Sequence, residues 1–173
     1  MVTLTMILEQ KYQALLQEAQ RRQLADIEGI QLCFQTLSLA SHIDNDCARL
    51  LAPYGLSEGR FVMLFLLDAA GEGLAPNELA ERAGVTRATV TGLLDGLERE
   101  ALIERQAVKQ DRRALRVQLT DKGRQTAKHV FHNHSTWIAS LFGSLSVTER
   151  AQLAILLNKV STGLSRSEKE RPQ

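Results

Sequence analysis

The chain lacks the features that mark secreted and membrane proteins. It has no run of about 18 apolar residues, so no membrane span is expected. The first residues, MVTLTMILEQ, lack a basic segment followed by a long apolar core, so no secretion signal is expected. Only two cysteines occur, Cys33 and Cys47, too few for a disulfide framework. We therefore expect a cytoplasmic protein with free thiols.

Recognisable catalytic and metal-binding motifs are also missing. The sequence contains no Gly-rich phosphate loop, no HExxH and no Ser/His/Asp order, so an enzyme is not expected. His129, His132 and His134 lie in one predicted helix, but His134 points away from the other two. A zinc site would need more ligands at workable spacing. We expect solvated or core histidines, with neither a metal nor a cofactor.

The most informative stretch runs from 86 to 119. Its first part predicts a helix with Thr86 as a plausible N-cap. The apolar residues Val90, Leu94 and Leu97 recur at helical spacing and define a buried face. The opposite face is polar and begins with Arg87, so solvent or a polar partner should cover it. A helix N-terminus directs backbone N–H groups and partial positive charge toward phosphate, which makes the first turn the part of most interest.

The segment before this helix completes a helix-turn-helix pattern. Pro76 suits the first turn of a helix over residues 76–83. Gly84 can take the left-handed conformation that closes a helix. Ala80 is small where two crossing helices must approach closely. Helix, glycine turn and second helix together match the helix-turn-helix motif.

A hairpin with a basic connection is expected next. Residues 103–107 and 115–119 alternate in polarity with period two, which favours two half-buried strands. The connecting residues, VKQDRRA, are too polar for a core. The segment from Arg105 to Arg116 has a local charge of +4, whereas the whole chain has +1. DNA phosphate is the expected partner of this patch, and a solvated charged turn is the alternative.

At this point the chain resembles the MarR family of transcriptional regulators (multiple antibiotic resistance regulators) from about Gly29 to Leu164. The residues that carry the resemblance are LAPNELAERAGVTRATVTGLLDGLEREALIER and QDRRALRVQLTDKG. Asp111 and Arg113 match the family's wing signature, which implies that Arg113 enters the minor groove and that Asp111 orients it. Many members have a long polar residue where this chain has Gly92, so part of the base readout is expected to be absent or to pass to Arg87.

The resemblance implies a mainly α fold with a small β-hairpin wing, in which a winged helix-turn-helix domain is joined to a helical dimerisation domain. It also implies a homodimer on a pseudo-palindromic DNA operator whose half-sites lie about one helical turn apart. A winged helix used for protein contacts is the alternative. The expected DNA-contact residues are Thr86, Arg87, Thr89, Thr91, Arg105, Lys109, Asp111, Arg112 and Arg113.

The remaining helices complete the expected organisation. Residues 3–25 form an amphipathic extension that packs on the dimer domain or remains a mobile arm. Helices are also expected over 27–52, over 57–70 with a fully buried block FVMLFLL, from Thr120 to about 142, and from the Ser146/Glu149 capping box to about 165. The expected divisions are 1–52 for the extension and dimerisation helix, 53–119 for the winged domain, 120–165 for the C-terminal dimerisation helices and 166–173 for a disordered tail.

The resemblance further implies a repressor that a small aromatic or anionic molecule releases, and the efflux-pump repressors are the nearest type. Its ligand pocket is expected between the dimer helices and the winged domain. The residues assigned to that pocket by position are Leu39, His42, Ile43, Phe61 and Phe65.

Cys33 supports an alternative function as a thiol-based oxidative-stress sensor. Some family members carry a reactive cysteine early in the corresponding helix, with two tyrosines bonded to the thiolate. The positions where these tyrosines are expected are Leu37 and Cys47, and no basic residue lies one turn from Cys33. We therefore expect Cys33 to be inert, as a small buried residue or part of a pocket wall, with a raised pKa. The sensor alternative requires Cys33 to pair with Cys47 of the other subunit on oxidation.

Overall fold

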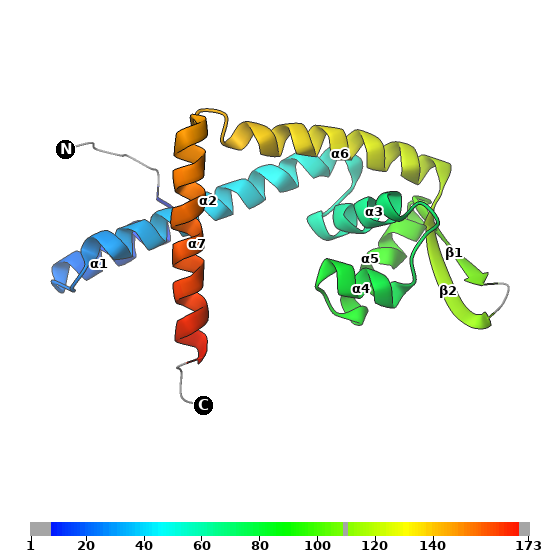
Figure 1. The fold of residues 1–173 in the computed structure, drawn as a ribbon, viewed down its shortest axis with the longest axis horizontal. Coiled ribbons are helices and arrows are strands. Elements are labelled where there is room, and N and C mark those ends of the chain that lie inside the picture. Colours follow the sequence, from blue (N-terminus) through cyan, green and yellow to red (C-terminus); the bar gives the residue numbers. More distant parts are fainter. Residues whose placement is uncertain (1–7, 109–110, 170–173) are drawn as a thin grey trace. The chain divides into compact units, whose positions relative to one another are not determined.

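The computed structural model describes residues 8–108 and 111–169, with side chains given outside 107–114 and 165–169. The fold is mainly α with one two-stranded sheet, as predicted (Figure 1). The elements are α1 (Gln10–Arg21), α2 (Ile27–Leu51), a 3-10 turn (Ala52–Tyr54), α3 (Glu58–Ala70), α4 (Pro76–Ala83), α5 (Arg87–Arg99), β1 (Ile103–Val108), β2 (Asp111–Leu119), α6 (Asp121–Leu141) and α7 (Val147–Lys169). They form two compact units that divide between Val130 and Phe131, inside α6.

Side-chain caps place the starts of the helices where the sequence predicts them. Ser57, Thr86 and Thr120 each accept a backbone hydrogen bond from the residue three positions on, at 3.4, 3.1 and 3.0 Å. At the start of α7, Ser146 and Glu149 form the predicted capping box, in which the Ser146 N–H donates to the Glu149 carboxylate at 2.8 Å. Each cap satisfies an N–H group that the first turn leaves without a helical partner.

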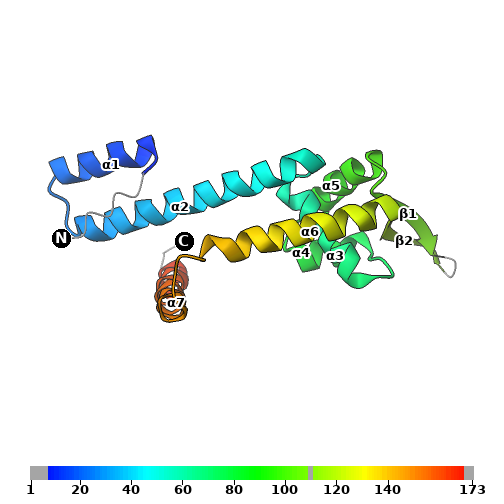
Figure 2. The same ribbon diagram turned by 90° about the horizontal axis from the view of Figure 1, so that it is seen from above.

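The core of the first unit lies where α3, α4, α5 and the hairpin meet (Figure 2). Met63, Leu79, Leu94 and Val117 are all buried there. The loop after α3 is joined to the hairpin, since Leu74 and Val117 exchange two backbone hydrogen bonds of 3.0 and 2.9 Å. These contacts attach the hairpin to the three helices.

The block FVMLFLL in α3 is less buried than expected. Phe61, Met63, Leu64 and Leu67 are buried, but Phe65 remains 39% exposed. The reason is geometric, because α2, α4, α5 and β2 contact α3 and the side that carries Phe65 stays partly open.

The hairpin strands extend further than predicted, through most of the polar VKQDRRA segment. Ile103 pairs with Leu119 at the base, and Val108 pairs with Asp111 beyond a register shift after Ala107. A two-stranded ribbon needs no buried partner on its outer face, so polar side chains do not stop the backbone from pairing.

The two terminal helices also differ from the predicted bounds. Helix α1 begins at Gln10 because Glu9 is extended and its N–H donates to Ser38 Oγ at 3.2 Å. Residues 1–7, which the prediction had begun to place in this helix at residue 3, lie outside the described residues. At the other end α7 continues to Lys169, so the expected disorder is wrong for residues 166–169, where no glycine or proline interrupts the helix. Residues 170–173 lie outside the described part.

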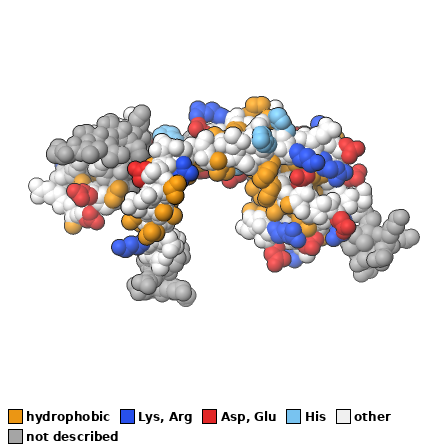
Figure 3. All heavy atoms as spheres, turned by 45° about the horizontal axis from the view of Figure 1, so that its top comes forward, with side chains coloured by type: hydrophobic (Ala, Val, Ile, Leu, Met, Phe, Trp, Pro, Cys, Tyr) orange, Lys and Arg blue, Asp and Glu red, His pale blue; other side chains and the backbone are white. Residues whose placement is uncertain are grey.

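The second unit consists of the end of α6 and α7, and α7 exposes many apolar side chains. Figure 3 shows hydrophobic side chains on its surface. The most exposed of them are Val147, Ile155, Leu156, Leu157, Val160 and Leu164. Among the described residues no single helix is long and apolar enough to cross a membrane.

Candidate nucleic-acid interface

Helices α4 and α5 form the predicted helix-turn-helix. Gly84 ends α4 with φ +66°, and the N–H of Val85 donates to the carbonyl of Ala80 at 3.1 Å. Leu79 and Ala80 are buried between the two helices. The left-handed glycine turns the chain so that α5 starts three residues later, at Arg87.

Helix α5 buries one face and exposes the other, as the sequence pattern indicates. Val90, Leu94 and Leu97 are buried. Arg87, Thr89 and Thr91 are exposed on the first turns. Their exposure leaves them available to a ligand outside the protein.

The threonines at the start of α5 are held by local hydrogen bonds. The Thr86 and Thr89 hydroxyls lie 2.8 Å apart, and the Thr91 hydroxyl donates to the Arg87 carbonyl at 3.0 Å. Gly92 lies on the exposed side, and a Cβ there would have nothing within 4 Å. The surface of α5 therefore has a gap in the middle of its polar face.

Arg105 is positioned differently from the expected DNA contacts on α5. Its guanidinium donates to the Asp95 carboxylate at 2.5 Å and lies 3.1 Å from the Glu98 carboxylate. The side chain is only 27% exposed. Both acids belong to α5, so Arg105 joins β1 to α5 and its charge is already compensated. This geometry removes the support for a phosphate contact by Arg105.

Four of the expected DNA contacts lie at the tip of the wing. Lys109 lies outside the described residues, and Asp111, Arg112 and Arg113 are placed by backbone only, at the start of β2. The predicted roles of these four residues remain predictions.

Arg60 of α3 is an anchoring residue that sequence reasoning missed. Its guanidinium donates to the Glu100 carboxylate at 2.9 Å and to the Gly55 carbonyl at 3.2 Å. A Cβ at Gly96 would lie 2.2 Å from the Arg60 guanidinium, so only glycine lets this arginine cross α5. The glycine in the middle of a helix was the signal in the sequence, because glycine inside a helix often marks a close approach.

The residues assigned to a ligand pocket are not gathered around one described cavity. Phe61 is buried in the core, whereas Leu39 and Phe65 are largely exposed. His42 is exposed on α2, where it lines a groove of about 470 Å³ with Asn45 and other residues of α2 and the 3-10 turn. A different cavity lies between α1 and α2.

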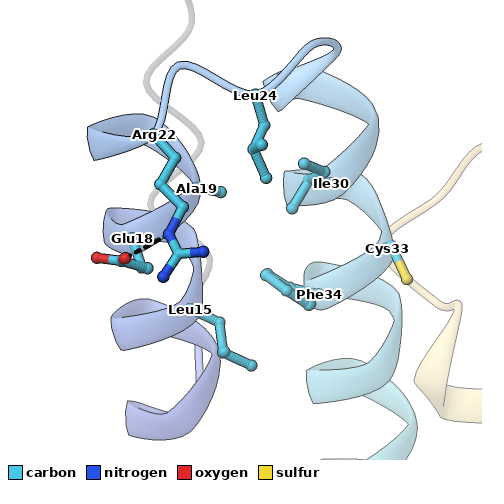
Figure 4. Close-up of a pocket in the computed structure, with 8 residues that line it drawn as sticks. All are labelled: Leu15, Glu18, Ala19, Arg22, Leu24, Ile30, Cys33 and Phe34. Carbon is cyan, nitrogen blue, oxygen red and sulfur yellow. Dashed lines mark hydrogen bonds and ion pairs between the residues drawn. The ribbon is translucent and has the colours of Figure 1, made fainter.

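The two cysteines also differ from expectation. Cys33 is exposed, so the predicted burial of this thiol is wrong for the chain by itself, whereas its expected place in a pocket wall is confirmed, since it lines a cavity between α1 and α2. Cys33 lies on α2 at the edge of this cavity, and its Sγ points away from α1 (Figure 4). Cys47 is buried, and burial raises the pKa of its thiol, with smaller contributions from Glu58 and Asp44. No group of three metal-ligating side chains occurs in the part of the chain that the structure describes.

Comparison with known proteins identifies the family to which this fold belongs. Residues 54–114, which span the end of the 3-10 turn to β2, match the model of the MarR family. The repressor YetL of Bacillus subtilis is 31% identical over 156 residues, covering 90% of this chain and 93% of YetL. The chain belongs to the MarR family.

Other relatives of this MarR protein agree. The repressor MprA of Escherichia coli K12 is 31% identical over 123 residues, 70% of each chain. The solved S. aureus MepR–DNA complex is 26% identical, covers 73% of this chain and 92% of MepR, and has a TM-score of 0.63. The MarR protein is therefore a transcriptional regulator with a winged helix-turn-helix, and not an enzyme.

Proposed function

We propose that the protein is a homodimeric repressor that binds a pseudo-palindromic DNA operator with α5 and the hairpin wing, and that a small molecule releases it. The observation that carries DNA binding is the division of α5 into a buried apolar face and an exposed polar first half. The MepR–DNA complex supports the same use of the fold. The cytoplasm is the compartment that such a regulator requires.

The proposed contacts are divided between α5 and the wing. Arg87, Thr89 and Thr91 contact bases and phosphates from α5, and the Thr86 cap orients its first turn. The wing contributes the basic residues Lys109, Arg112 and Arg113, with Asp111 orienting Arg113. Arg105 is withdrawn from this set and becomes a positioning residue.

The proposed dimer uses α7 together with α2 and α6. Val160 is 64% exposed, and it forms one apolar row along α7 with Leu156, Leu157 and Leu164. Water contact with such a row is unfavourable, and a second copy of the chain would bury it. Two copies of the chain present two α5 helices, one for each half-site of a pseudo-palindromic operator.

DNA binding is tested by replacing Arg87 at the start of α5, with Arg99 at the end of the same helix as the control. An operator selected from random DNA serves as the probe, and affinity is measured by fluorescence anisotropy at two salt concentrations. Arg87→Ala should weaken binding about tenfold or more and reduce the salt dependence. Arg113→Ala, in the wing, should cause a loss of similar size.

Arg99→Ala is the matched control. Arg99 is exposed at the opposite end of α5 and carries the same charge, so its loss should change affinity by about twofold or less. Equal losses in Arg87→Ala and Arg99→Ala would contradict a contact through the first turn. Full affinity in both Arg87→Ala and Arg113→Ala would contradict the proposed reading face.

A further inference from the structure

The chain between α5 and the wing, residues 100–102, is bound by groups from two other helices. This short segment leads from the end of α5 into β1. Hydrogen bonds reach it from the start of α6 and from Arg60 of α3. None of its three residues belongs to the proposed DNA-contact set, so these bonds serve another purpose.

The start of α6 binds the backbone carbonyls of all three residues. The Lys122 ammonium group donates to the Glu100 carbonyl at 2.8 Å. The Thr120 hydroxyl donates to the Ala101 carbonyl at 2.8 Å, and the Thr120 N–H donates to the Leu102 carbonyl at 3.1 Å. Carbonyls at the end of a helix have no partner inside that helix, so these bonds attach the end of α5 to α6.

Arg60 binds the same segment through a side chain. Its guanidinium donates to the Glu100 carboxylate and to the Gly55 carbonyl, as described above, and so joins the end of α5 to the turn between α2 and α3. That turn also contacts α6, since the rings of Tyr54 and His129 meet edge to face with centroids 5.7 Å apart. The turn, the end of α5 and the start of α6 therefore form one closed set of contacts.

Two glycines allow these elements to approach closely. A Cβ at Gly123 in α6 would overlap the Leu102 carbonyl oxygen, and a Cβ at Gly96 in α5 would overlap the Arg60 guanidinium. Both positions are inside helices, where glycine lowers stability relative to alanine. The close contact that each glycine permits is a reason for its presence.

A small rotation at this end of α5 has a large effect at the other end. Helix α5 has 13 residues. With a rise of about 1.5 Å per residue, its first and last residues lie about 18 Å apart along the axis, so a rotation of about 10° at residues 100–102 moves the first turn by about 3 Å. Successive base pairs are separated by about 3.4 Å. The contacts at residues 100–102 therefore decide which base pairs the first turn of α5 can reach.

We propose that Arg60 and Lys122 are positioning residues that set the half-site spacing at which the protein binds DNA. Both act through Glu100, which they bind from two different helices. Helix α6 belongs to the proposed dimer interface, so the angle between α5 and α6 sets the separation of the two α5 helices in the dimer. This inference rests on the proposed binding of a dimer to a pseudo-palindromic operator.

The test measures how affinity depends on half-site spacing. Full-length protein is titrated by fluorescence anisotropy with the selected operator and with versions whose centre is one base pair longer or shorter. For the wild type, either change should weaken binding by about tenfold or more. In Arg60→Met and Lys122→Met this ratio should fall to about threefold or less, because α5 is then free to tilt. Lys122→Arg keeps a donor and should restore the wild-type ratio.

Two control variants separate positioning from charge and from stability. Arg124→Met removes the same charge from the first turns of α6, but Arg124 pairs with Asp121 of its own helix at 3.5 Å, so the spacing ratio should stay at the wild-type value. Ala69→Gly lowers the melting temperature without touching residues 100–102 and should also keep the ratio. Lys122 is exposed, so Lys122→Met should remain folded.

A measurement without DNA follows the angle between the helices directly. Residual dipolar couplings of the backbone amides should fit one rigid orientation of α5 and α6 in the wild type. In Arg60→Met and Lys122→Met the couplings of α5 should become smaller relative to those of α6.

A wild-type spacing ratio in both Arg60→Met and Lys122→Met would overturn the proposal, as would an equal fall in Arg124→Met or Ala69→Gly. Absence of any spacing preference in the wild type would instead contradict the proposed operator. In that case unchanged couplings in both variants would overturn the positioning role as well, and smaller couplings of α5 would retain it.

Discussion

The Arg105 guanidinium and the Asp95 carboxylate lie 2.5 Å apart and join the first strand of the wing to the reading helix. Glu98, one turn further along α5, contacts the same guanidinium at 3.1 Å. The direction in which the wing leaves α5 is therefore set by ionic contacts as well as by the apolar core. Two roles of Arg105 can therefore be distinguished by experiment. One is to bind DNA phosphate, and the other is to position the wing.

Asp95→Asn distinguishes the two tasks. The substitution removes one negative charge from the DNA-facing helix, so a purely electrostatic role would give tighter binding. If Arg105 positions the wing, Asp95→Asn should instead weaken operator binding by about three- to tenfold, as should Arg105→Gln. Each should also lower the free energy of unfolding by about 1 kcal/mol or less, since both carboxylates are around half exposed. Tighter binding by Asp95→Asn would refute the positioning role.

Ala101 is expected to be a site of backbone strain. Its φ of +55° is in the left-handed region, which an L residue with a Cβ enters at a cost of about 1–2 kcal/mol. Ala101→Gly should therefore raise the free energy of unfolding by about 0.5–1 kcal/mol, measured by urea denaturation. The control is Ala69→Gly in α3, which should lower it by a similar amount because glycine weakens an ordinary helix. A loss of stability in both variants would show that the strain at Ala101 has no energetic consequence.

Val160 tests the dimer. Val160→Glu places a charge in the exposed apolar row of α7, and burial of an unpaired charge in an interface is costly. We expect a concentration-dependent loss of dimer in analytical ultracentrifugation and loss of operator binding. Asn158→Glu introduces the same residue on the other side of α7 and should leave the dimer intact. A dimer that tolerates both substitutions equally would place the interface elsewhere.

Acid should loosen the start of α7. The hydroxyl and then the N–H of Ser146 hydrogen-bond to the Glu149 carboxylate and lower its pKa below the usual 4.5. Because the pKa of Glu149 is lower in the folded protein than in the unfolded chain, its ionised carboxylate stabilises the folded state. This stabilisation is complete above the unfolded pKa and is lost as the pH falls through the folded pKa. Chemical shifts of residues 147–150 should show fraying below about pH 4.

Glu149→Gln should remove this pH response and leave a cap that is weaker at neutral pH. Glu81→Gln, on the surface of α4, controls for the loss of a carboxylate elsewhere. Fraying that continues unchanged in Glu149→Gln would assign the transition to another group.

Cys33→Ser tests the thiol-sensor alternative. Cys33 is exposed, but the buried Cys47 thiol has a raised pKa and is a poor partner for oxidation. We expect Cys33→Ser to retain operator binding, and we expect peroxide to leave wild-type binding unchanged. Peroxide-driven release that disappears in Cys33→Ser, with a dimer-sized band on non-reducing gels, would instead establish the sensor.

The parts of the fold that could be predicted from the sequence are those with local causes. The caps at Thr86 and Ser146 involve residues three positions apart, and the glycine turn at Gly84 needs a single residue, so short windows of sequence contain them. The buried face of α5 follows from periodicity in the same way. These features define the helix-turn-helix.

The features that escaped prediction depend on contacts that are distant in sequence. Arg60 reaches Glu100 across 40 residues, and the start of α1 is set by Ser38. The ion pairs of Arg105 with Asp95 and Glu98 also escaped prediction, because its charge was counted without these two residues, which precede the counted segment. The exposure of Cys33 depends on which side of α2 is covered by α1, and residue order alone does not reveal this.

The open space at Gly92 has a consequence for how this protein can change over time. A side chain added there meets nothing within 4 Å, and it would stand on the polar side of α5 among Arg87 and Thr91. Replacing a helical glycine also favours the helix by about 1 kcal/mol. A substitution at Gly92 can therefore change which operator sequence is preferred without lowering the folding stability. The recognition of DNA can then diverge after gene duplication while the rest of the fold stays the same.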